Sequence, residues 1–447
     1  MTVTFRSRRA ALLQIAAMGA IALAAGGARG APTAPIELKQ AAAEAWLYGL
    51  PLIEAAANRA QLLSSVGANR LLHHRKLATP ADRWVTSPNN DTIYSNAWIN
   101  LARGPVTIDL PAIGERYASF AFMDATGRNF TVLGSRTTGP AARRVTLVGP
   151  GQATTDPFAV RAPSVWVWFL ARFLTTGPDD LPAVWRLQDR LRISGGAAAP
   201  DHAHAANDAP WPDYFASVQA LLKENPPPLV DAAFFQRISA LGLGVTGGFD
   251  AARFDAGARR EIEAGVTEAR AAARAPWRGQ TVDGWLYPDL RPGGPDLLRR
   301  AQVAMNGIGG LPPEEALYLR GVDAQGRNAI AADKSWRLHF PAGGLPPVDG
   351  FWSLSMYEVA ADSKRYFAEN PIDRYSIGDR TPGLRTNPDG SLDIWLSRAD
   401  PGGPRTANWL PLPAGPAGSL TFRAYLPQAR FLKGDYRLPP ILPAAAA

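Results

Sequence analysis

Alternating apolar and polar residues in short runs constrain the fold of this chain more than any other feature. Such runs fill two regions, 84–172 and 336–440, for example "SPNNDTIYSNAWINL" at 87–101 and "GFWSLSMYEV" at 350–359. The 42 glycines and 40 prolines among 447 residues are enough to join many short elements by turns. A period of two is typical of antiparallel strands that bury one face. We expect a mainly β protein with helical segments.

Helical periodicity appears before and between these two regions. Residues 37–63 carry apolar side chains at spacings of three and four and predict a helix that contains Pro51. Four more helical stretches lie between residue 179 and about 305. The expected organisation is a signal peptide over 1–30, an N-terminal helical segment over 31–79, a small antiparallel β-sandwich over 80–178, a helical insertion over 179–314 and a jelly-roll-like β-sandwich over 315–447.

The N-terminus has the pattern of an export signal. A basic start is followed by an apolar stretch from Ala10 to Ala25 and then by small residues up to Gly30, after which we expect cleavage. Arg8 and Arg9 resemble the twin-arginine pattern, and a general secretory signal with a chance arginine pair is the alternative. We therefore expect a periplasmic or secreted bacterial protein with no stable membrane span once the signal is removed.

Composition excludes several classes of function. The chain has no cysteine, so disulfides and thiolate chemistry are absent. Residues 1–30 carry four arginines and no acid, which leaves 43 basic and 39 acidic residues in the mature chain, too mild a charge for a nucleic-acid partner. "GLGVTG" at 242–247 has dinucleotide-loop spacing but follows a helical stretch, so we interpret it as a helix exit. His202 and His204 do not make a convincing metal site, and we predict no metal and no cofactor.

The stretch "SPNNDTIYSNAWINL" can be interpreted either as a ligand-binding surface or as a capped turn. On a strand, Thr92, Tyr94, Asn96, Trp98 and Asn100 share one face, while Ile93, Ser95, Ala97, Ile99 and Leu101 share the other, which we expect to be the core face. Amides and aromatic rings on the first face are the groups that bind sugars and other polar small molecules. Alternatively, Asn89, Asn90 and Asp91 serve only to cap a turn.

Two parts of the chain resemble known families. "SPNNDTIYSNAWINLARGPVTIDLPAIGERYASFAFMD" resembles the core motif of domain of unknown function 1254, and the segments "FWSLSMYE", "NPIDRYSIGDRTPGL", "NPDGSLDIWL", "NWLPLP" and "LTFRAYLP" resemble domain of unknown function 1214. The resemblance implies a helical segment, a small β-sandwich, a helical insertion and a C-terminal sandwich, and it implies no reaction. The matching positions are Pro88, Asn89, Asp91, Thr92, Tyr94, Trp352, Tyr357, Asn370, Arg374, Tyr375, Asn408, Trp409, Pro411, Arg423 and Tyr425. Asn100 and the residues around Trp336 depart from the family pattern.

Two functions stay open on this sequence. The first is an enzyme, a hydrolase or lyase acting on a polar small molecule or glycan-like substrate, in which carboxylates move protons and arginines hold the substrate. The second is a non-catalytic ligand-binding or structural module of the cell envelope. The sequence also leaves open a homo-oligomer. Candidate catalytic residues are Asp91, Tyr94, Arg374 and Arg423, and candidate ligand-binding residues are Asn89, Asn90, Thr92, Trp98, Trp352, Tyr357, Tyr375, Asp379 and Tyr425.

The export prediction has a direct test. Replacing Arg8 and Arg9 together by lysine keeps the positive charge but removes the arginine pair, so the twin-arginine route predicts that the variant stays in the cytoplasm. Fractionation of cells that produce both forms, with N-terminal sequencing of the exported one, measures this. Unchanged export of the variant would leave the general secretory route.

Overall fold

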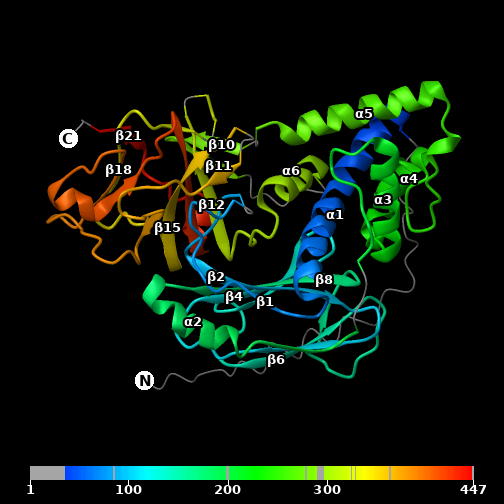
Figure 1. The fold of residues 1–447 in the computed structure, drawn as a ribbon, viewed down its shortest axis with the longest axis horizontal. Helices are drawn as coiled ribbons and strands as arrows, with labels where there is room; N and C mark the ends of the chain where they lie inside the picture. Colours follow the sequence, from blue (N-terminus) through cyan, green and yellow to red (C-terminus); the bar gives the residue numbers. More distant parts are fainter. Residues whose placement is uncertain are drawn as a thin grey trace, which may run out of the picture.

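The structure is a computed structural model that describes residues 36–83, 86–197, 201–276, 279–288, 296–323, 325–327, 329–361 and 364–444. The export signal expected over 1–30 lies outside these residues. Within them, the chain forms a helical unit and two β-sandwiches, which meet in the middle of the molecule (Figure 1). The expected fold class, mainly β with helical segments, is confirmed. Among the described residues, no helix is both long and apolar enough to cross a bilayer.

The helical unit is built around the first helix, which the sequence predicted at nearly the same bounds. α1 (Leu38–Val66) contains Pro51 and packs against α3 (Trp211–Glu224), α5 (Ala256–Arg274) and α6 (Leu297–Gly307). Gly265 permits the close crossing of α5 over α1, because a Cβ there would lie 2.1 Å from the carbonyl oxygen of Lys39. α2 (Leu181–Gln188) and α4 (Ala232–Arg237) complete the four helical stretches expected after residue 179. The chain leaves a short helix at Gly242, which has a φ of 73°, so the helix-exit interpretation is confirmed.

The first sandwich consists of two sheets. One has the strand order β1 (Leu72–His73), β2 (Thr92–Asn100), β8 (Trp166–Leu174), β4 (Ala118–Met123) and β5 (Asn129–Gly134). The other has the order β7 (Val160–Arg161), β6 (Arg143–Val148), β3 (Val106–Leu110) and β9 (Arg192–Gly195). After α2 the chain therefore returns to this sandwich through β9, which pairs with β3.

The two faces of β2 are buried in different places. Ile93, Ala97 and Ile99 lie in the core between the two sheets, as the alternating pattern predicted. On the opposite face, the Trp98 ring stacks on Trp168, and its Nε1 donates to Asn58 of α1 at 3.0 Å. Protein therefore covers the end of this face that carries Trp98.

The second sandwich also has two sheets. The larger has the order β10 (Gly279–Val282), β11 (Trp285–Pro288), β12 (Ala316–Gly321), β20 (Ala417–Pro427), β15 (Val348–Val359) and β16 (Arg365–Tyr366), with β13 (Ile330–Ala331) on β20 and β17 (Ser376–Gly378) on β15. The smaller has the order β19 (Trp409–Pro411), β18 (Leu392–Ser397), β14 (Trp336–Phe340) and β21 (Ile441–Pro443). Leu354, Met356, Ile394 and Leu396 belong to the core between these sheets.

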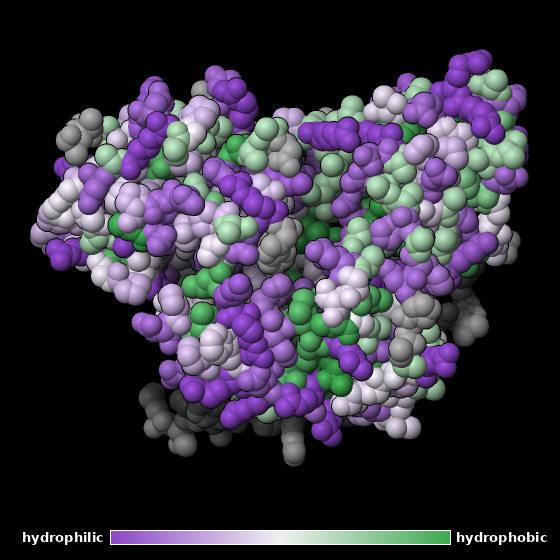
Figure 2. Space-filling model, viewed as in Figure 1, coloured by the Kyte–Doolittle hydropathy of each residue, from purple (hydrophilic) through white to green (hydrophobic). Residues whose placement is uncertain are grey.

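The outer surface and the centre of the molecule differ in character. On the face shown in Figure 2, hydrophilic residues dominate the periphery, while hydrophobic residues gather near the middle, where the three parts meet. A further apolar cluster joins the parts there, with Ala55 from α1, Trp98 and Trp168 from the first sandwich, and Phe351 and Tyr425 from the second. The sandwiches therefore share a buried interface.

The core of the second sandwich gives a stability prediction. Leu396 is 1% exposed, so Leu396→Ala removes buried methyl groups and leaves a cavity, which costs about 2–5 kcal/mol of unfolding free energy. Leu345→Ala is the matched control, because Leu345 is 40% exposed and its truncation should cost less than about 0.5 kcal/mol. Urea unfolding of both variants measures the difference, and equal losses would show that the core is misassigned.

Candidate functional site

The segment before β2 docks on the second sandwich. Ser87 donates its backbone N–H to the carbonyl of Arg365 at 2.7 Å, and the hydroxyl of Tyr357 donates to the carbonyl of Pro88 at 2.7 Å. The backbone N–H of Arg365 donates in turn to the hydroxyl of Thr86 at 3.1 Å. These bonds explain why the apolar strand starts with polar residues, since the segment crosses a domain boundary where backbone groups need partners.

Asn89 and Asn90 both fix the shape of this segment. The Asn89 side chain accepts the N–H of Asp91 at 2.8 Å and donates to the hydroxyls of Tyr94 at 3.0 Å and Tyr425 at 2.8 Å. Asn90 accepts from the N–H of Ala78 and donates to its carbonyl, both at 2.8 Å. The capping role therefore describes Asn89, which also contacts the second sandwich, whereas Asn90 ties the segment to the backbone of Ala78, 12 residues earlier in the chain.

Asp91 occupies the buried centre of the domain boundary. Its side chain is 8% exposed, and its Oδ2 accepts hydrogen bonds from the hydroxyls of Ser353 at 2.6 Å and Tyr425 at 3.2 Å. Burial raises the pKa of Asp91, while the charge of Arg423 and the two hydroxyl donors act in the opposite direction. The net shift is upward, so the carboxyl holds its proton more strongly than an exposed aspartate does.

Arg423 lies behind this carboxyl and donates its hydrogen bonds to uncharged groups. It donates from Nη1 to the hydroxyl of Ser355 at 2.7 Å and from Nη2 to the hydroxyl of Tyr357 at 2.8 Å. Burial alone would lower the pKa of Arg423, but Tyr357, Tyr425 and Asp91 raise it above its ordinary value. In the described part of the chain no ion pair joins Arg423 to Asp91, so the cation influences the acid only through its field.

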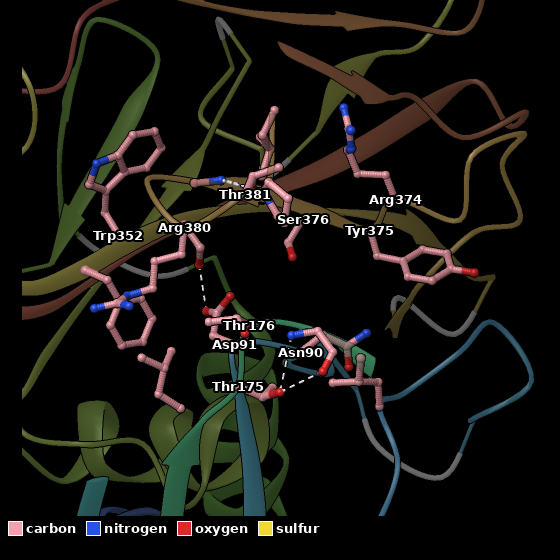
Figure 3. Close-up of a pocket in the computed structure, with 18 of the residues that line it drawn as sticks. Asn90, Asp91, Thr175, Thr176, Trp352, Arg374, Tyr375, Ser376, Arg380 and Thr381 are labelled. Carbon is pink, nitrogen blue, oxygen red and sulfur yellow. Dashed lines mark hydrogen bonds between the residues drawn. The ribbon is translucent and has the colours of Figure 1, made fainter. Parts of the chain in front are cut away.

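A cleft opens between the two sandwiches beside Asp91 (Figure 3). Its volume is about 380 Å³. The first sandwich contributes the end of β8 and the segment before β2, and the second contributes β15, β17 and the loops that flank β17. The lining residues are Leu77, Asn90, Asp91, Leu174, Thr175, Thr176, Gly177, Phe351, Trp352, Ser353, Ile372, Asp373, Arg374, Tyr375, Ser376, Ile377, Gly378, Arg380, Thr381 and Pro382. The cleft thus combines apolar walls with hydroxyl groups.

Two of the predicted residues line the cleft but extend away from Asp91 in Figure 3. Arg374 donates from Nη1 to the carbonyls of Thr406, Ala407 and Trp409, at 3.3, 3.0 and 2.8 Å. Tyr375 donates to Asp373 at 3.1 Å, and burial together with this bond raises the pKa of Tyr375 to about 12. Both side chains therefore brace the wall of the cleft.

The other predicted residues divide into three groups. Trp352 borders the cleft, and its backbone N–H donates to Asp379 at 3.2 Å, a carboxyl whose pKa burial raises to about 6. Tyr357, Arg423 and Tyr425 are buried behind Asp91. Thr92, Tyr94 and Trp98 do not line the cleft, and the Tyr94 ring instead lies beneath the buried guanidinium of Arg172 at 5.5 Å.

The hydroxyl groups of the cleft were not among the residues predicted for the site. Ser353 lies on the same strand as the predicted Trp352, and Ser353, Ser355 and Tyr357 alternate with the core residues of β15. That alternation is visible in the sequence and marks a polar strand face. It does not show that this face meets Asp91, which lies 262 residues away.

The "DHAH" segment contributes its aspartate to an ion pair. Asp201 accepts from the guanidinium Nε of Arg59 at 2.8 Å, an ion pair that engages the carboxylate nearest the two histidines. Among the described residues, no group of three or more histidine, aspartate or glutamate side chains is placed to hold an ion.

Comparison with known proteins agrees with this architecture. Residues 68–195 match the family described as "Protein of unknown function (DUF1254)", and residues 314–429 match "Protein of unknown function (DUF1214)". The chain combines a DUF1254 domain with a DUF1214 domain. The cleft lies between them, with Asp91 from the DUF1254 domain and Ser353 from the DUF1214 domain.

Two solved structures are similar over most of the chain. The VPA0106 protein from Vibrio parahaemolyticus has 20% sequence identity and a TM-score of 0.68, with 92% of this chain and all of that chain covered, which shows a shared fold. A putative uncharacterized protein from Burkholderia cenocepacia has 13% identity and a TM-score of 0.43, with 91% and 92% covered. No curated protein matches the chain.

The raised pKa of Asp91 gives a prediction about stability and pH. The uncharged carboxyl stabilises the fold at low pH, and this contribution is lost as the pH rises through the raised pKa. Asp91→Asn keeps an uncharged side chain of the same shape, so its stability relative to the native protein should increase between about pH 5 and about pH 8.

Asp91→Ala serves as the comparison. It leaves the hydroxyls of Ser353 and Tyr425 without their acceptor and should cost about 1–3 kcal/mol at both pH values. Urea unfolding of the three proteins measures these differences. An Asp91→Asn protein that is less stable than the native one at about pH 8 would show that the charged form is favoured.

Proposed function

We propose that the cleft is the active site of an exported hydrolase or lyase, in which Asp91 is the general acid for a small polar substrate. The observation that carries this proposal is the position of the Asp91 carboxyl, buried at the domain boundary yet part of the cleft wall. A carboxyl whose pKa is raised by burial keeps its proton to a higher pH than an exposed aspartate does and can donate it to a reacting oxygen.

The hydrogen bonds of Asp91 indicate where this proton lies. Oδ2 already accepts from two hydroxyls, Ser353 and Tyr425. In the described part of the chain no hydrogen bond reaches Oδ1, and the residue borders the cleft. When Asp91 is protonated, its proton therefore belongs on Oδ1, on the side where a substrate would bind.

The same contacts stabilise the Asp91 carboxylate that proton transfer leaves behind. When Asp91 gives the proton on Oδ1 to the oxygen of a leaving group, the carboxylate that remains still receives hydrogen bonds from Ser353 and Tyr425. The field of Arg423 stabilises its charge. A hydrolase would complete the reaction with water, and a lyase would complete it by elimination, with Asp91 regaining a proton in either case.

The cleft also limits the size of the substrate. A volume of about 380 Å³ is near the lower end of the range for small-molecule sites, so it suits a single sugar unit or a compound of similar size. Leu174, Phe351 and Ile377 provide apolar walls around the hydroxyls. We propose that the substrate carries both an apolar part and a reacting oxygen, and that the enzyme meets it outside the cytoplasm, in keeping with the export signal expected at 1–30.

A binding module without chemistry is the second candidate. The hydroxyls of Thr176 and Ser376 line the cleft, and such groups hold a polar ligand without a reaction. The two candidates differ in the use of the Asp91 proton. Binding needs only a hydrogen-bond donor at this position, which an amide also supplies, whereas catalysis needs an acid.

The substitution Asp91→Asn distinguishes the two candidates. In a screen of small esters, lactones, amides and glycosides, general acid catalysis predicts that Asp91→Asn lowers kcat by about 10²–10⁴-fold. Asp333→Asn is the matched control, because Asp333 is exposed and lies outside the cleft, and its kcat should be unchanged. Binding of a compound that no form of the protein converts would favour the binding module.

A further inference from the structure

We infer that the hydroxyl of Ser353 is the nucleophile of the cleft, with Asp91 as its base, and that the enzyme hydrolyses small esters or lactones through an acyl-serine intermediate. This inference rests on the proposed function, because it adds a second catalytic residue to the same cleft and selects hydrolysis over elimination. The partner of Ser353, its place in the cleft and its contrast with neighbouring hydroxyls all support it.

Ser353 makes the contact that an activated serine requires. Its Oγ donates to Oδ2 of Asp91 at 2.6 Å, a distance at which a hydroxyl can pass its proton to a base. The base is itself held in place, since the hydroxyl of Tyr425 donates to the same Oδ2 at 3.2 Å and Asn89 donates to Tyr425 at 2.8 Å. A nucleophile, a base and a group that orients the base therefore lie in one chain of hydrogen bonds.

Two other hydroxyls of the cleft wall bond to the backbone instead. Thr175 donates to the carbonyl of Gly177 at 3.1 Å, and the hydroxyl of Thr381 accepts the N–H of Gly378 at 2.9 Å. Both bonds shape the loops that carry these threonines. Ser353, in contrast, bonds to a carboxyl group that lines the cleft itself.

Ser353 also lies beside a cation of the cleft wall. Phe351 and Ser353 share one face of β15 and line the cleft, while Trp352 between them belongs to the core of the second sandwich. The guanidinium of Arg380 lies over the ring of Phe351 at 5.5 Å, and no hydrogen bond engages it in the part of the chain that the structure describes. Residues two apart on a strand are separated by about 7 Å, so Arg380 is the cation nearest to hand when attack by Ser353 places negative charge on a carbonyl oxygen.

These residues define the class of substrate. Attack by a serine requires a carbonyl carbon, and the acid role proposed for Asp91 requires a leaving group that departs as an oxygen. Esters and lactones combine both groups. The cleft volume of about 380 Å³ restricts them to small molecules.

The reaction needs no co-reactant except water. Burial raises the pKa of Asp91, which makes its carboxylate a stronger base than that of an exposed aspartate. Ser353 passes its proton to this carboxylate as Oγ bonds to the carbonyl carbon. The Asp91 carboxyl then gives the proton to the leaving oxygen as the bond between that oxygen and the carbonyl carbon breaks.

Water completes the cycle with the same two residues. It loses a proton to the Asp91 carboxylate as its oxygen bonds to the acyl carbon. The bond between that carbon and Oγ of Ser353 then breaks, and Asp91 returns the proton to Oγ. The product leaves as a carboxylic acid, and both side chains regain their starting forms.

Covalent labelling of the full mature chain tests the nucleophile directly. Phenylmethanesulfonyl fluoride transfers its sulfonyl group to activated serines with loss of fluoride, and peptide mass mapping of the native protein should place the label on Ser353. Asp91→Asn removes the base and should slow labelling by about 10²–10⁴-fold. Ser65→Ala is the control, because Ser65 is exposed on α1 and lies outside the cleft, so its labelling at Ser353 should match that of the native protein.

Ester hydrolysis gives the second measurement. With 4-nitrophenyl acetate as substrate, Ser353→Ala should lower kcat by at least about 10³-fold, because it removes the nucleophile. Urea unfolding shows whether this variant is folded, and the mapped label on the native protein decides the matter if it is not. A label on another residue, no label on the native protein, or equal labelling of Asp91→Asn would each overturn the inference.

The two substitutions also separate the inference from the proposed function. If a folded Ser353→Ala protein keeps the native kcat while Asp91→Asn loses it, Ser353 is not the nucleophile and Asp91 remains the acid of a reaction with water or of an elimination. If both variants keep the native kcat, the inference and the proposed function are both wrong.

Discussion

The arrangement of the two sandwiches depends on the carboxyl of Asp91, which accepts hydrogen bonds from Ser353 and Tyr425 of the other domain. Around it, Tyr357 bonds to the carbonyl of Pro88, and Asn89 bonds to Tyr425. Polar groups are costly to bury and are satisfied here only in one relative orientation of the domains. The cleft exists because this orientation leaves one side of Asp91 uncovered.

A second buried polar cluster, separate from Asp91, also joins the two sandwiches. Glu315 of the C-terminal part accepts from the hydroxyl of Tyr117 at 3.0 Å and pairs with Arg136 at 2.6 Å, both from the first sandwich. Phe351 stacks on Tyr425 between the two clusters, with ring centroids 4.1 Å apart. Aromatic packing supplies much of the apolar burial at this interface, and the polar clusters fix its register. A boundary of this kind favours a fixed cleft over two independently moving domains.

Local features of this fold could be predicted from the sequence, and long-range ones could not. The faces of β2 follow from its alternation, and Gly127, with a φ of 74°, turns the hairpin between β4 and β5, a conformation that glycine adopts readily. The alternating region expected up to residue 440 does not end in a strand, because Pro439 and Pro440 lack the N–H that pairing needs, and the last strand begins at Ile441 instead.

The candidate site also could be predicted from the sequence only in part. Its family motifs identified Asp91 and Arg374 as residues of interest, but a sequence pattern does not reveal bonding partners. Arg374 has the charge of a ligand-binding residue, yet it bonds to the carbonyls of its own domain. Ser353 looks like an ordinary polar residue of a strand until the fold places it 2.6 Å from Asp91. Likewise, the Trp98 ring is of the kind that stacks on ligands, but the fold buries it in the core.

A comparison of asparagine with aspartic acid at position 91 separates what the domain interface requires from what a reaction would require. An asparagine would also accept the hydroxyls of Ser353 and Tyr425 and would avoid the cost of burying an ionisable group, so the interface alone does not require an acid. What an aspartic acid adds is a proton that can leave and return. A buried acid whose pKa is raised and which borders a cleft has the arrangement expected of a proton donor.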